Sequence, residues 1–368
     1  MRARVVIGAN YGDEGKGLVT DYLCSRGPGA GVVVRFNGGA QAGHTVVTPE
    51  GVRHVHHHFG SGTLLGIPTF LSKYFVVNPI VYLKEADELK TKLTEPPIVY
   101  VDPQCKVTTF VDMIINQRKE EARGLQRHGS VGLGLHETMQ RSQMESMCIT
   151  MADLWNFDRR RLEAKLQEAC NKWFQFRTKS KRPLENADAM IDKFLNGCQR
   201  FADQVHPAGI AQCAKLDPVF EGAQGLLLDQ DNKANWPHVT HSKTGLHNAA
   251  LLCGQMGVTD LQVFYVSRTY LTRHGAGPLP LEAADMRFED DTNRPHDYQG
   301  VLRFAPMEWD KLLQRIGADF DSIKPNWSSW FKLVLTHCDQ MPPNPYECLA
   351  DLYSFGATRN DVKLDYRR

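Results

Sequence analysis

Short runs of consecutive apolar residues recur along the chain, and most of them end in a glycine-rich or polar segment. Several of these runs contain many β-branched residues and have the length of buried strands: 4–9, 31–36, 98–101, 217–220, 261–268 and 331–336. Apolar residues recur with helical spacing in the segments between them: 18–24, 81–93, 109–123, 151–205 and 309–316. Strands that alternate with helices in this way predict an α/β fold with a largely parallel central sheet flanked by helices.

Two segments between these elements are predicted to be irregular. Residues 270–280 are rich in glycine and proline and carry Arg273, and residues 290–304 are polar. Open parallel sheets bind ligands outside the carboxyl ends of their strands. The glycine loops that follow the strands are therefore predicted to form the functional site.

Composition and charge exclude several classes of protein. The chain has 368 residues with 43 Lys and Arg against 42 Asp and Glu, and acidic residues interleave the basic groups at 159–161 and 179–182. No apolar run reaches the length of about 18 residues that predicts a membrane span, and no secretory signal precedes the first strand. The 9 cysteines are scattered without a CxxC pair, which is typical of reduced thiols. We therefore expect a cytoplasmic protein that binds neither nucleic acid nor membrane.

The loop at residues 10–17 carries the strongest local signal. Its glycines lie between a strand and a helix, an arrangement that directs backbone N–H groups at a phosphate. It is not a standard P-loop, because Asn10 takes the place of the first glycine and Gly17 that of Ser or Thr. Asp13 and Glu14 would repel a phosphate unless they hold a metal ion or move a proton. A glycine-rich surface turn is the alternative for this loop taken alone.

A second glycine-rich loop, at residues 37–45, follows the second strand. Two such loops after consecutive strands predict a ligand at the same edge of the sheet. His44 could stand close to a bound group there, although a surface histidine is the alternative. A cluster of four histidines follows between residues 54 and 58, and both a metal site and the polar face of a strand agree with its spacing.

Several motifs together resemble, in order and spacing, those of the adenylosuccinate synthetase family. The four main motifs are 12–17 (GDEGKG), 38–45 (GGAQAGHT), 221–225 (EGAQG) and 272–278 (TRHGAGP). Asn78-Pro79 and the motifs 336–339 and 354–359 extend the resemblance over nearly the whole chain. The resemblance implies a P-loop-related fold in a single domain, residues 1–368, with a helical insertion around 151–205.

The resemblance also implies an activity. Members of the family join L-aspartate to C6 of a 6-oxopurine nucleotide, using a nucleoside triphosphate, Mg²⁺ and a 6-phosphoryl intermediate. Asp13 matches the base that removes the N1 proton, and with Gly43 it matches the Mg²⁺ ligands. His44 matches the residue that donates to the charge developing on O6. A homodimer is expected from the same resemblance.

The resemblance assigns the other site residues in four groups. The phosphates of the triphosphate would bind Gly12, Glu14, Gly15, Lys16, Gly17, Gly43 and Thr45. The purine monophosphate would bind Asn10, Gln41, Ser130, Arg141, Gln224 and Thr240, with Arg141 acting across the dimer interface. Aspartate would bind Thr292, Asn293, Arg294 and Arg303. The base of the triphosphate would bind His337, Asp339 and Gly356.

Departures from the family pattern bear on the substrate. The loop expected to bind aspartate and ribose keeps only Arg294 and Arg303, and fewer donors there fit a sugar without the 2′-hydroxyl. This favours the phage-type branch, which makes succino-2-amino-deoxyadenylate from dGMP and aspartate for 2-aminoadenine DNA, over the ordinary enzyme that uses IMP and GTP. His337 replaces the usual lysine partner of Asp339, which leaves the phosphoryl donor open between GTP and ATP or dATP.

Two other classes of protein are alternatives to a ligase. A descendant that only binds nucleotide would be expected to lose Asp13, Lys16 or His44, and all three are present. A GTPase switch would need the GK[ST] signature that this chain lacks. A switch hydrolyses triphosphate without aspartate, whereas a ligase needs aspartate and the monophosphate together.

Overall fold

The computed structural model describes the chain except for residues 27–30, 291, 294–299, 324–327, 343–349 and 365–368. Its centre is a ten-stranded sheet in the order β16-β15-β14-β11-β1-β10-β2-β5-β7-β9. Neighbouring strands are parallel except for β15 and β16 at one edge, which confirms the predicted largely parallel sheet. The strands are β1 (Arg2–Gly8), β2 (Val32–Arg35), β5 (Thr69–Leu71), β7 (Val99–Val101), β9 (His206–Pro207), β10 (Pro218–Glu221), β11 (Asp260–Arg268), β14 (Ser328–Thr336), β15 (Leu352–Ser354) and β16 (Val362–Leu364).

Strand β1 lies at the middle of the sheet, and its apolar residues cover both faces. Val5 and Ile7 point to one face, where they pack with α9 (His247–Met256) and α10 (Trp309–Asp321). Val6 points to the other face and packs with α1 (Lys16–Ser25). Side chains alternate between the faces of a strand, so a strand that is buried on both faces must be apolar throughout.

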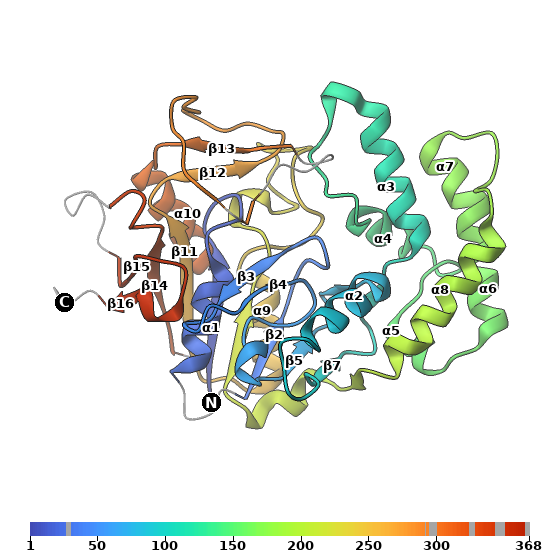
Figure 1. Ribbon diagram of the computed structural model, residues 1–368, viewed down its shortest axis with the longest axis horizontal. Helices are drawn as coiled ribbons and strands as arrows, with labels where there is room; N and C mark the ends of the chain where they lie inside the picture. The colour runs from blue at the N-terminus through green and yellow to red at the C-terminus, as the bar shows by residue number, and fades with distance from the viewer. Residues whose placement is uncertain (27–30, 291, 294–299, 324–327, 343–349, 365–368) are drawn as a thin grey trace.

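A group of helices forms a second apolar core beside the β7 end of the sheet (Figure 1). It contains α2 (Pro79–Leu89), α3 (Phe110–Arg123), α4 (Leu135–Arg141), α5 (Met151–Trp155), α6 (Arg159–Glu168), α7 (Phe174–Thr178) and α8 (Ala187–Ala202). Helix α8 buries Phe194, Leu195 and Phe201 on one side, as its 3.6-residue spacing predicts. The last four of these helices occupy the segment where the helical insertion is expected. No helix among the described residues is long and apolar enough to cross a membrane.

Short strand pairs cover the carboxyl edge of the sheet. Strands β12 (Leu271–His274) and β13 (Leu302–Ala305) are antiparallel, and both lie at the top of Figure 1. They fall within the segments predicted to be irregular, so that prediction was wrong, because four-residue strands beside many glycines and prolines give almost no periodic signal. The other pairs are β3 (His44–Val47) with β4 (Arg53–His56), and β6 (Val76–Val77) with β8 (Lys106–Val107).

Candidate active site

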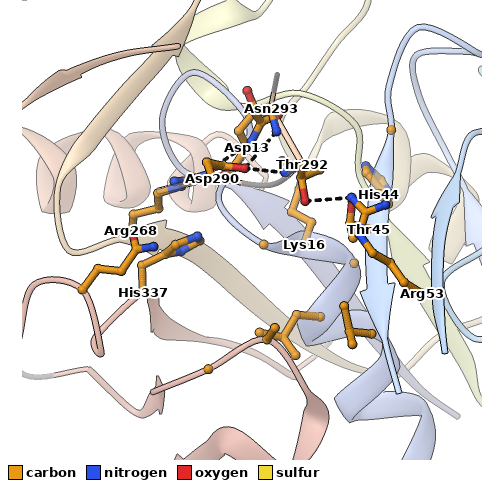
Figure 2. Close-up of a pocket in the computed structure, with 18 of the residues that line it drawn as sticks. Asp13, Lys16, His44, Thr45, Arg53, Arg268, Asp290, Thr292, Asn293 and His337 are labelled. Carbon is orange, nitrogen blue, oxygen red and sulfur yellow. Dashed lines mark hydrogen bonds and ion pairs between the residues drawn. The ribbon is translucent and has the colours of Figure 1, made fainter. Parts of the chain in front are cut away.

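A cavity of about 360 Å³ lies where β1, β11 and β14 end (Figure 2). Its lining includes both predicted catalytic residues and members of three predicted groups: those for the phosphates of the triphosphate, for aspartate and for the base of the triphosphate. These residues are Asp13, Gly15, Lys16, Gly17, Gly43, His44, Thr45, Thr292, Asn293, His337, Asp339 and Gly356. Parallel strands end at one edge, so segments more than 300 residues apart in the sequence meet there.

A buried ion pair between Glu14 and Lys16 stabilises the loop between β1 and α1. Glu14 accepts hydrogen bonds from the backbone N–H groups of Asn10 (3.0 Å) and Gly12 (2.8 Å), and Lys16 Nζ lies 2.6 Å from its Oε2. Glu14 does not line the cavity, and its carboxylate bonds within the loop, so a contact with phosphate stays a prediction. Lys16 lines the cavity and begins α1, whose N-terminal N–H groups suit an anion.

Two glycines let the loop take this shape. Gly15 has φ 89°, a left-handed conformation that other residues rarely adopt. A Cβ atom at Gly17 would stand 2.8 Å from the carbonyl oxygen of Thr45. Glycine at position 17 therefore brings the two predicted phosphate loops into contact.

Asp13 sits on this loop with φ 62° and lines the cavity. Burial raises its pKa, and the charges of Arg268 and Lys16 oppose that rise. Arg268 Nε donates to the carbonyl oxygen of Asp13 (2.7 Å), and its Nη2 donates to Asp290 (2.7 Å). A carboxyl group with a raised pKa is suited to accept a proton near neutral pH.

Sequence reasoning missed Arg268 and Asp290. Arg268 is the last residue of a strand that was predicted, and a charged residue at the carboxyl end of a buried parallel strand is the signal that pointed to it. Nothing in the local sequence indicates Asp290, whose contacts are with Arg268, far away in sequence, and with the turn at Thr292 and Asn293.

His44 is paired with a buried carboxylate. Its Nδ1 lies 2.8 Å from Glu221 Oε1, and Ser61 also donates to Glu221. Burial acts to raise the pKa of Glu221, but His44, Arg35 and Ser61 outweigh it and bring the pKa to about 2. Burial lowers the pKa of His44 to about 4, so its ring is neutral at pH 7. With the Glu221 carboxylate next to Nδ1, an incoming negative charge would favour protonation of the ring.

The residues predicted to bind aspartate divide in the structure. Thr292 and Asn293 line the cavity, and Arg53, from β4, donates to Thr292 Oγ1 (3.2 Å). Arg294 lies outside the described residues. Arg303 does not line this cavity, because its guanidinium donates to the carbonyl oxygens of Gly275 and Gly277 and to Glu282. In this structure Arg53 lines the cavity and Arg303 does not, so binding of aspartate by Arg303 stays a prediction.

The far end of the cavity holds the residues predicted to bind the base of the triphosphate. His337 has φ 58°, and its side chain is half-buried near Arg268. Burial first, and then the positive charge of Arg268, lower the pKa of His337 to about 3. The ring is therefore neutral near pH 7 and cannot replace the charge of a lysine next to Asp339.

Acid is expected to destabilise the protein through His337. The pKa of His337 is about 3 in the folded protein and about 6.5 in the unfolded chain, so the unfolded chain binds more protons between these two values. The free energy of unfolding therefore decreases as the pH is lowered through this range. From about pH 7.5 to about pH 5 the loss is at most about 2 kcal/mol of the free energy of unfolding. Urea denaturation of the wild type and of His337→Asn at both pH values measures it, because asparagine tolerates a left-handed backbone. Equal pH dependence in both proteins would contradict the assignment.

A second cavity, of about 440 Å³, is lined by Gln224, which contacts Gly12 of the Asp13 loop. Four residues predicted to bind the monophosphate line it: Gln41, Ser130, Gln224 and Thr240. Several cationic or neutral donors line it too: Lys119, Arg123, His241, Arg273 and His274. Gly12 packs against Gln224, since a Cβ atom at Gly12 would stand 3.6 Å from the Cα atom of Gln224. The loop of Asp13 therefore lies between residues of the two cavities, since Asp13 lines the first cavity and Gly12 contacts Gln224 of the second.

Two residues predicted to bind the monophosphate, Asn10 and Arg141, form polar contacts within the protein instead. Asn10 donates to Ser267 (2.8 Å) and accepts from Arg315, and it lines neither cavity. Arg141 is fully buried and binds Asp112 (2.8 Å) and the carbonyl oxygens of Val107 and Met147. In this structure the polar groups of both residues are used inside the fold, and a nucleotide contact for either stays a prediction.

Mg²⁺ prefers oxygen ligands in octahedral geometry. Asp13 and Gly43 offer a carboxylate and a carbonyl oxygen, and both residues line the first cavity next to Lys16 and Thr45. The donor set therefore fits the ion that the sequence resemblance implies.

Comparisons with known proteins agree with this arrangement. The family model described as adenylosuccinate synthetase matches residues 5–324. The adenylosuccinate synthetase of Alkalilimnicola ehrlichii is 35% identical over 76% of this chain, and the match covers 65% of that relative's length. The enzyme of Pseudomonas fluorescens is 31% identical over 87% of this chain and 74% of its own. The match thus spans slightly less than two thirds of the first of these relatives.

Solved structures share the fold. The fully ligated adenylosuccinate synthetase of Plasmodium falciparum superimposes with a TM-score of 0.70 and 19% identity, over 91% of this chain and 77% of that one. The succinoaminodeoxyadenylate synthetase of cyanophage S-2L, bound to dGMP and dATP, gives a TM-score of 0.62 and 17% identity, over 99% and 95%. Because the family model matches residues 5–324, which are most of the chain, the chain belongs to the adenylosuccinate synthetase family.

Proposed function

We propose that the protein is a carbon–nitrogen ligase that joins L-aspartate to C6 of a 6-oxopurine nucleotide, with cleavage of a nucleoside triphosphate. The observation that carries the proposal is the position of Asp13, on a loop between two cavities, with a pKa raised by burial. One cavity has the Lys16 ammonium and the start of α1 for a triphosphate, and the other has donors for a monophosphate.

The residues suggest the order of events. Asp13 removes the N1 proton of the purine, and O6 attacks the γ-phosphorus as the nucleoside diphosphate leaves. Lys16 exchanges its bond to Glu14 for one to the phosphates. His44, held by Glu221, donates to the charge on O6. The aspartate amine then attacks C6 and displaces phosphate. Asp13 and Gly43 would hold Mg²⁺, which supplies positive charge against the transferred phosphoryl group.

We propose dGMP as the preferred nucleotide. Three observations support this choice: the aspartate loop lacks most of the family's arginines, Arg303 is used inside the fold, and the chain matches the cyanophage enzyme over nearly the whole length of both. Gln224 lines the second cavity, and its buried side-chain oxygen has no hydrogen-bond partner among the described residues, so a rotation of the amide would suit the 2-amino group that guanine has and hypoxanthine lacks. The ordinary reaction of IMP, aspartate and GTP is the second candidate, favoured by the names of the 31–35% identical relatives.

The value of kcat/KM is expected to be at least about tenfold higher for dGMP than for IMP, because a group built to bond the 2-amine is left unpaired by a base without it. Phosphate release in a series that crosses dGMP, GMP and IMP with GTP, ATP and dATP measures this, with aspartate matched. Equal or higher values for IMP would assign the protein to the ordinary reaction. Release without aspartate would contradict a ligase altogether.

Arg53→Gln is expected to raise KM for aspartate by about 10–100-fold with kcat nearly unchanged. Arg53 lines the first cavity beside Thr292, and a charge-assisted bond to a carboxylate contributes about 1.5–3 kcal/mol to binding. Steady-state kinetics with varied aspartate measures the change, and Arg160→Gln on the exposed side of α6 is the matched control. An unchanged KM for aspartate would remove Arg53 from the aspartate site.

A further inference from the structure

Part of the histidine cluster forms a compact buried group outside both cavities. His54 and His56 lie on one face of β4, and Glu85 comes from α2. All three side chains are buried, and one ligand atom from each lies within 4.8 Å of the other two. None of the three lines either cavity.

The ring nitrogens of His56, unpaired within the part of the chain that the structure describes, indicate a ligand. Neither of its ring nitrogens, nor Nε2 of His54, has a hydrogen-bond partner among the described residues. A buried polar group that is left without a partner costs about 1–3 kcal/mol. A neutral imidazole keeps a lone pair for a metal.

Glu85 is already fixed in position to complete the group. Its carboxylate accepts hydrogen bonds from the backbone N–H groups of His57 (2.8 Å), His58 (2.7 Å) and Phe59 (3.3 Å). His58 accepts from the backbone N–H of Asn78 at Nε2 (2.9 Å), which leaves its Nδ1 to carry a proton 3.5 Å from Glu85. Supporting bonds of this kind orient the ligands of a metal.

The distances agree with shared coordination. Zinc binds imidazole nitrogen and carboxylate oxygen at about 2.0–2.2 Å, so two ligand atoms on one tetrahedral ion lie about 3.4 Å apart. His54 Nε2 and Glu85 Oε1 are 3.7 Å apart. The ligand atoms lie within 4.8 Å of one another, so the widest pair needs to close by at most about 1.4 Å, which rotation of the side chains supplies.

We propose that His54, His56 and Glu85 bind one divalent transition-metal ion of the Zn²⁺ type. Two imidazoles and one carboxylate are ligands that such ions favour. With the metal on Nε2 of His54, the proton moves to Nδ1, and Lys92 keeps its bond to the carbonyl oxygen of Arg53 (2.9 Å) in place of the one to that ring.

The ion would join β4 to α2. Because His56 is opposite His44 in the β3–β4 pair, it would also brace the hairpin that carries His44. This role is structural, and it does not depend on the proposed function.

Metal content of the full chain tests the proposal. The protein is prepared without a polyhistidine tag, stripped with chelator, mixed with Zn²⁺ or Co²⁺ in excess Mg²⁺ to fill oxygen sites, and desalted. We expect about one transition-metal ion per chain, visible absorption of tetrahedral or five-coordinate Co²⁺, and a Tm that rises with the metal. His56→Phe should lose all three responses and still fold, because His56 makes no hydrogen bond that phenylalanine would break.

His206→Phe is the matched control, because His206 is an exposed histidine of β9 and should keep all three responses. His54→Gln is a second ligand variant if His56→Phe does not fold. Wild-type protein that retains less than about a tenth of an equivalent of metal, or ligand variants that retain as much as the wild type, would overturn the proposal.

Discussion

Asp13→Asn is expected to lower kcat by at least about 10³-fold while nucleotide binding remains, because an amide cannot accept the N1 proton. Asp13 combines a position between the cavities with a pKa raised by burial, and asparagine keeps its size and its tolerance of a left-handed backbone. Phosphate release under saturating substrates measures turnover, and calorimetry with the triphosphate measures binding. In the wild type, kcat/KM should fall on acidification as Asp13 becomes protonated.

The control for this variant is Asp203→Asn, the same change at an exposed position outside both cavities. It should leave kcat unchanged. A rate for Asp13→Asn within about tenfold of the wild type would remove Asp13 as the base, because a general base contributes about 10²–10⁴-fold.

Arg141→Met is expected to lower the free energy of unfolding by about 3–5 kcal/mol, because removing one partner of a buried ion pair leaves the other charge uncompensated. Arg141 and Asp112 are both fully buried, and two guanidinium nitrogens contact the carboxylate at 2.8–2.9 Å. Asp112 also caps α3 through the backbone N–H of Thr109. Urea denaturation measures the loss.

A second variant separates this structural role from the role expected across a dimer. The double variant Asp112→Asn with Arg141→Met removes both charges and should be more stable than Arg141→Met alone. If Arg141 instead served a partner subunit, Arg141→Met would keep its stability and lose activity. Mixing it with Asp13→Asn would then restore activity through one intact site per dimer.

Six strands of the central sheet were predictable because their information is local, whereas the short strands β5, β9, β15 and β16 were not predicted. Val5, Val6 and Ile7 form a consecutive apolar run, which is typical of a strand buried on both faces. Strands β12 and β13 were missed because each pairs only with the other, and a four-residue strand has no period to detect.

The site divides in the same way. Asp13, Lys16 and His44 stand in glycine-rich loops whose residue types reveal them, and the structure brings all three to one cavity. Asn10, Arg141 and Arg303 have equally suitable side chains, but the fold gives each one internal partners. Arg53, Arg268 and Asp290 show the converse, because no motif surrounds them and the sheet edge brings them to the cavity.

The order of apolar and glycine-rich segments was thus sufficient for the α/β class, the parallel sheet and the loops at its carboxyl edge. Periodicity and backbone freedom are properties of neighbouring residues, so they can be read along the chain. Whether a charged or imidazole side chain meets a cavity, a carbonyl oxygen or another side chain depends on residues far away in sequence. Arg141 pairs with Asp112 because α3 packs against α4, and His56 lies next to Glu85 because α2 packs against β4.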